Sequence, residues 1–139
     1  MSNEKLIDVE SSWYSKSPEE KTAHANEIAK SFGIPDSALV EVDAYKAELT
    51  KHNAWDLPFL GYVNEDGYGY AYVPNEAVAA DGWDAHAAFK NLSEDGKTAF
   101  AIRMLFTHRD VGRAGAEMYL RMNRNFTIRR EGVASAKYA

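Results

Sequence analysis

The sequence predicts an α+β fold in which several helices pack on a small antiparallel β-hairpin or sheet. Three observations lead to this prediction. Apolar stripes with helical spacing occur before and after the middle of the chain, an alternating pattern surrounds a turn at 57–73, and 139 residues with 45% hydrophobic side chains suffice for one core. We expect the single domain at residues 16–127, after an N-terminal arm at 1–15 and before a basic C-terminal tail at 128–139.

Two helices are expected before the hairpin. Ser17–Glu20 combines a capping box with a proline at the first helical position, and Gly33–Pro35 ends that helix. The second helix is expected to have its cap at Asp36 or Ser37 and to end near Trp55–Pro58, because the residue before a proline disfavours helical geometry. Its apolar face recurs every three or four residues: Leu39, Val42, Tyr45 and Leu49.

The hairpin prediction depends on Leu57–Val63 and Tyr68–Val73, which flank the turn residues Asn64–Gly67. Alternation along the second strand places three tyrosines on one face: Tyr68, Tyr70 and Tyr72. This face either packs under helices or anchors a protein partner, since tyrosines are frequent at interfaces. Stacking on nucleic acid is disfavoured, because residues 57–96 contain one lysine and seven acids.

Three further helices are expected after the hairpin. Asp84 caps a short one that continues to Phe89, Leu92–Asp95 opens a longer one, and Asp110 caps the last. The longer helix is expected to bury Phe100 and Met104, with Ile102, Leu105 and Phe106 as further candidates. In the last helix one stripe contains Ala114, Met118 and Met122.

Charge is divided unevenly along the chain, although the total is only −5. Residues 1–96 contain 18 acidic and 7 basic residues, a net charge of −11, whereas residues 97–139 contain 3 acidic and 9 basic residues, a net charge of +6. This basic part either binds nucleic acid or an acidic partner, or pairs with the acidic part of the same molecule. The arginines named as candidate contacts are Arg113, Arg121, Arg124, Arg129 and Arg130.

Residue chemistry favours a protein without catalytic, cofactor-binding or metal-binding residues. The chain has no cysteine, and its four histidines lack the spacings of zinc motifs. No nucleophile motif is present, and the carboxylate pairs Glu65-Asp66 and Glu94-Asp95 fall at turn and cap positions. With no apolar run near ~18 residues and no signal-peptide pattern at its start, the chain is expected to be cytoplasmic and not to bind membranes.

The order of elements from Val42 to Phe126 resembles the ArdB/KlcA antirestriction family of plasmids and other mobile elements. In that family a helix leads into an aromatic hairpin that closes on proline, Leu-Ser-x-Asp opens a long apolar helix, and a last helix carries aromatic and basic residues. The matching pieces here are Tyr45–Leu49, Phe59–Val63, Tyr68–Pro74, Leu92–Asp95 and Ala101–Phe106. The chain departs from the family at Leu60, Gly61 and Tyr68, and in its arginine-rich end.

The resemblance implies a non-enzymatic inhibitor of type I restriction enzymes, which evades host defence by protein–protein contacts in the bacterial cytoplasm. Its expected partner is a restriction or other defence nuclease complex, and the phage, plasmid or chromosomal origin stays open. The alternative is a nucleic-acid-associated module that binds phosphates through its arginine-rich C-terminal segment. The sequence does not specify the oligomeric state.

Overall fold

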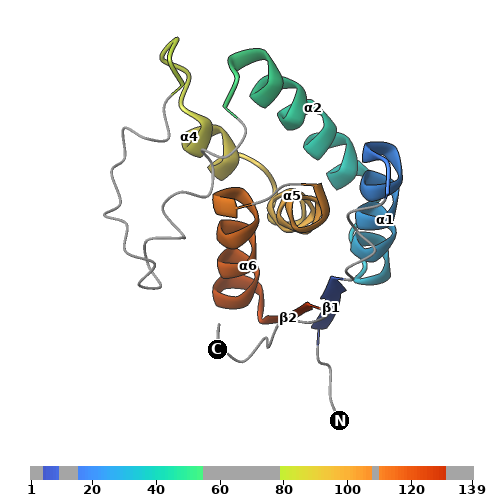
Figure 1. Cartoon of the computed structure of the whole chain (residues 1–139). Coiled ribbons are helices and arrows are strands. Elements are labelled where there is room, and N and C mark those ends of the chain that lie inside the picture. Colours follow the sequence, from blue (N-terminus) through green and yellow to red (C-terminus); the bar gives the residue numbers. More distant parts are fainter. Residues whose placement is uncertain (1–4, 10–15, 55–78, 108–109, 131–139) are drawn as a thin grey trace.

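The computed structural model describes residues 5–9, 16–54, 79–107 and 110–130. Figure 1 shows α5 in the middle of the molecule, with α1 and α2 on one side and α6 on the other. The helix α5 packs directly against all three. The elements in chain order are β1 (Lys5–Val9), α1 (Pro18–Ser31), α2 (Asp36–His52), α4 (Ala85–Lys90), α5 (Glu94–Thr107), α6 (Asp110–Arg124) and β2 (Phe126–Arg130). The α+β prediction is confirmed.

The start of α1 follows the expected capping box. Ser17 Oγ accepts a hydrogen bond from the Glu20 backbone N–H at 3.1 Å, and Glu20 Oε1 accepts one from the Ser17 N–H at 2.8 Å. The helix ends at Ser31, and Gly33 follows with φ +88°. That left-handed conformation is accessible to glycine without a steric penalty, which explains why the helix stops there.

The helix α2 begins and ends differently from the prediction. Pro35 is its N-cap residue and no side chain caps it, so the expected cap at Asp36 or Ser37 is wrong, and Asp36 is already inside the helix. The helix ends at His52 because Asn53 adopts φ 55°, ahead of the expected Trp55–Pro58 segment. The expected apolar face is buried: Leu39, Val42, Tyr45 and Leu49.

The described sheet consists of β1 and β2, which run parallel with Ile7 opposite Ile128. It corrects the expectation of a lightly packed arm at 1–15 and a tail from 128, because residues 5–9 and 128–130 are strand residues. Alternate side chains bury against the helices: Ile7, Val9, Phe126 and Ile128. The predicted antiparallel hairpin at 57–73 lies outside the described residues, and the parallel pairing of β1 with β2 was not predicted.

Helices α4 and α5 begin where the sequence predicts. Asp84 Oδ1 accepts a hydrogen bond from the Ala87 N–H at 2.9 Å and caps α4. Because α5 is enclosed by α1, α2 and α6, its buried residues surround the helix and do not form one stripe. All five expected residues of α5 are buried: Phe100, Ile102, Met104, Leu105 and Phe106.

The stripe predicted for α6 is partly wrong. Met118 is buried, but Met122 is 52% exposed. Residues 115–120 are all buried, so this stretch of α6 is covered on every side, whereas Met122 lies in the last turn beyond it. Met122 therefore lies at the surface near the C-terminal end of α6.

Candidate functional site: the arginines and their carboxylate partners

Arg103 is a buried arginine on α5 that contacts both α1 and α2. Its Nη1 donates to Asp43 Oδ1 at 2.7 Å, and its Nη2 donates to Asn26 Oδ1 at 2.8 Å. The arginine side chain is 4% exposed, whereas that of Asp43 is 69% exposed. Burial, together with the nearby Arg103 charge, lowers the pKa of Lys46. The Arg103 guanidinium thus joins three helices from inside the protein.

Arg124, at the end of α6, is held by groups at the start of α5. Its Nε donates to Thr98 Oγ1 at 2.8 Å, its Nη1 donates to the Asn123 carbonyl at 2.9 Å, and its Nη2 pairs with the Glu94 carboxylate. The guanidinium also lies 5.4 Å from the centre of the Tyr119 ring. Hydrogen bonds from Lys97 and Arg124 lower the pKa of Glu94. This arginine stabilises the α5–α6 contact.

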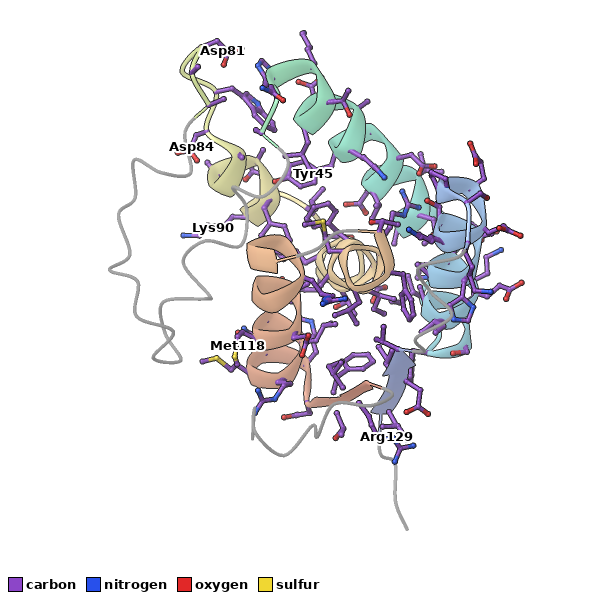
Figure 2. The ribbon with its side chains drawn as sticks, viewed as in Figure 1. Tyr45, Asp81, Asp84, Lys90, Met118 and Arg129 are labelled. Atoms are coloured by element: carbon purple, nitrogen blue, oxygen red, sulfur yellow. The ribbon has the colours of Figure 1, made fainter. Side chains whose placement is uncertain are left out.

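Arg129 joins the two strands of the sheet. Its Nε and Nη2 donate to the two carboxylate oxygens of Asp8 at 2.7 and 3.2 Å, which is the bidentate geometry typical of arginine with a carboxylate. The hydrogen bond from Arg129 lowers the pKa of Asp8. Figure 2 shows Arg129 at the sheet end of the molecule, away from the helices. Both side chains of this pair are more than half exposed.

The other predicted contact residues fall into two groups. Arg113 and Arg121 are half-buried on α6, and Arg121 Nη1 lies 3.8 Å from Met118 Sδ. Arg130 belongs to β2, but its side chain lies outside the described part, as do the predicted tyrosines Tyr68, Tyr70 and Tyr72. Among the described residues, Arg121 makes no ion pair with a carboxylate. In this respect it differs from Arg124 and Arg129, whose guanidinium groups are each paired with a carboxylate.

The Leu-Ser-x-Asp segment has a structural role in the described part of the chain. Ser93 Oγ accepts a hydrogen bond from the Gly96 N–H at 2.9 Å and donates one to Glu41 Oε2 at 2.6 Å. Glu41 Oε1 also accepts the Ser93 N–H at 2.9 Å, and these Ser93 contacts lower the pKa of Glu41. This serine therefore caps α5 and fixes its first turn against α2.

His52 forms a cluster that the spacing of residues along the chain did not reveal. Its Nδ1 lies 2.5 Å from Asp81 Oδ2, its Nε2 lies 3.3 Å from Glu48 Oε1, and its ring stacks on Trp83 with 4.5 Å between ring centres. His52 and Asp81 are 29 residues apart, so local spacing does not indicate that they meet. The two carboxylates lie on opposite ring nitrogens, so they do not converge on one point.

A small cavity of about 120 Å³ adjoins Arg124, between the starts of α5 and β2. This volume is well below the ~300 Å³ at which typical small-molecule sites begin. Within residues 5–9, 16–54, 79–107 and 110–130, no cluster of three His, Asp or Glu side chains could hold a metal ion. No helix in the same ranges is both long and apolar enough to cross a bilayer.

No protein-family model, curated protein or solved structure matches this chain. The geometry of the described residues therefore provides the comparison between the two functional hypotheses. Three arginines of the basic part pair with carboxylates of the same molecule: Arg103, Arg124 and Arg129.

Proposed function

We propose that this chain is a non-enzymatic inhibitor of a bacterial defence nuclease, of the antirestriction kind, and acts by protein–protein contacts. The observation that supports this over nucleic-acid binding is the internal pairing of Arg124 and Arg129, two of the five arginines named as candidate contacts. A phosphate would have to replace a carboxylate already in place at each position. The remaining support is the resemblance to the ArdB/KlcA family, which implies that type I restriction enzymes are the targets.

Within the described residues, the C-terminal end of α6 is the surface we propose for contact. Met122 is 52% exposed there, and the half-buried Arg121 precedes it. Methionine and arginine are enriched at protein interfaces, because a flexible apolar side chain adapts to its partner and a guanidinium pairs with carboxylates. Arg121 and Met122 together offer a partner both kinds of contact.

The test is plating of unmodified phage on a type I restricting host that expresses the chain, with a non-restricting host as control. We expect restored plating on the restricting host and unchanged plating on the other. Soluble expression without restored plating would refute the antirestriction proposal. A DNA-binding assay at about 50 and 200 mM salt separates the alternative, since phosphate contacts weaken steeply with salt.

Two variants test the contact surface. The R121E/M122S double variant should lose the restored plating while keeping its unfolding midpoint close to that of the wild type. The matched control is V40S, which changes a side chain that is 66% exposed on α2. Figure 1 shows that α5 separates α2 from α6. If R121E/M122S protects phage as well as V40S does, the contact surface lies elsewhere.

A further inference from the structure

The His52 cluster joins two parts of the chain that are separate in sequence. His52 is the last residue of α2, whereas Asp81 and Trp83 belong to the turn that precedes α4. Figure 2 shows Asp81 at the tip of this turn, beside the end of α2. The His52 side chain is 15% exposed, whereas the side chains of its two carboxylate partners, Glu48 and Asp81, are 48% and 54% exposed.

The turn itself is closed by three short-range hydrogen bonds. The Ala79 N–H donates to the Trp83 carbonyl at 2.7 Å, and the Gly82 N–H donates to the Ala79 carbonyl at 2.9 Å. The Trp83 N–H donates to Asp81 Oδ1 at 3.1 Å, while Asp81 Oδ2 faces the imidazole. Asp81 thus uses one oxygen to shape the turn and the other to hold it against α2.

The geometry around the ring discriminates between the two protonation states of histidine. A neutral imidazole has one N–H and one lone pair, so it can donate to only one of two carboxylates and directs the lone pair at the other. An imidazolium donates to both Glu48 and Asp81, and its positive charge also favours the stacked indole of Trp83. These two carboxylates are the charged groups that the described part of the structure places against the ring.

We propose that His52, Glu48, Asp81 and Trp83 form a pH-sensitive latch, which holds the turn at 79–83 against α2 when the imidazole is protonated. The latch is therefore closed while the imidazole carries its proton and loosens when a rise in pH removes that proton. This device is independent of the proposed antirestriction function.

Loosening should remain local to the turn. A separate contact holds α4, because the Tyr45 hydroxyl donates to the Ala85 carbonyl at 2.6 Å, and burial raises the pKa of Tyr45. That hydroxyl keeps its proton across the neutral range and its hydrogen bond is unaffected by the histidine. The α4 amide of Ala88, which donates to the Asp84 carbonyl, is thus an internal reference.

The experiment is native-state amide exchange of the full chain at about pH 5.5 and about pH 8, expressed as protection factors that remove the intrinsic pH dependence. In the wild type we expect the protection of Ala79 and Gly82 to fall about fivefold on going to the higher pH. Ala88 should change little. In H52Q the protection of Ala79 and Gly82 should not depend on pH.

Two further variants make the result specific. D81N keeps an oxygen for the Trp83 N–H and offers an amide donor to the neutral imidazole. In this variant the protection of the Ala79 and Gly82 amides should therefore not fall at the higher pH. H24Q is the matched control, because His24 packs edge-on against Phe106 with 4.9 Å between ring centres, and it should behave as the wild type. Equal pH dependence in the wild type, H52Q and D81N would overturn the proposal, as would a wild-type turn whose protection does not change.

Discussion

The Arg103–Asp43 pair allows a comparison in which removing the exposed carboxylate should cost more stability than replacing its buried partner by methionine. The D43A variant leaves the guanidinium in the interior with Asn26 as its remaining described partner, and Arg103 Nε is already without a hydrogen bond. A buried charge that loses its counter-charge is strongly destabilising, commonly by about 3–5 kcal/mol. Because Asp43 is 69% exposed, water can reach part of the vacated position, and we expect a loss of about 2 kcal/mol.

The R103M variant has a different outcome. Methionine retains an apolar stem of similar length, and the released Asp43 carboxylate returns to water at little cost since it is already mostly exposed. Replacing a buried ion pair by an apolar side chain is often neutral, so we expect a change within about 1 kcal/mol. R103A also removes the stem and leaves a cavity, which should cost about 3 kcal/mol.

Urea unfolding followed by far-ultraviolet circular dichroism measures these differences, provided the variants share one m value. D36A is the matched control, because Asp36 pairs with Lys30 at 3.2 Å but both side chains are more than half exposed. It should change stability by less than about 0.5 kcal/mol. The reasoning would be refuted if D43A behaved like D36A, or if R103M lost as much stability as R103A.

Three further predictions follow from the contacts of α5. R124A should lose about 2 kcal/mol of stability in the same urea assay, since it removes bonds to Thr98 and Glu94, whereas R121A should change it by less than about 0.5 kcal/mol. G96A should be close to neutral alone but stabilise the E41A background by about 1 kcal/mol, because a Cβ at Gly96 would lie 2.7 Å from Glu41 Oε1. Stability should fall below about pH 4, because three carboxylates whose pKa values are lowered in the folded state must take up protons there. They are Asp8, Glu41 and Glu94. Measuring the free energy of unfolding as a function of pH checks this.

The helices were predictable because their signals are local. The Ser17 capping box and the Asp84 cap each act within three residues, so the sequence alone contains both partners of each hydrogen bond. The second helix shows the limit of such signals. Asp36 has the right side chain for a cap, and a cap there would start the helix at Ser37. The fixed φ of Pro35 instead lets the helix begin at Asp36.

The sheet and the ion pairs could not be predicted because their partners are distant in sequence. Asp8 and Arg129 are 121 residues apart, and five-residue strands carry too few alternating positions to indicate which segment pairs with which. The same reason applies to His52 and Asp81. For α6, helical spacing places Met118 and Met122 on one face but does not show where the buried part of the helix ends, and Met122 was therefore wrongly assigned to the core.

The unequal exposure within the ion pairs determines which charge a partner meets first. Asp43 and Glu94 are each about 70% exposed, whereas their arginines are 4% and 23% exposed. The arginine stems cover apolar surface while the carboxylates extend into water, so the basic sequence of the C-terminal part does not produce an equally basic surface at these pairs. A polyanion that approaches them meets carboxylates, which repel it. A protein partner instead can use Arg121 and the exposed Met122 together, and this asymmetry is the physical basis for preferring protein contacts over phosphate binding.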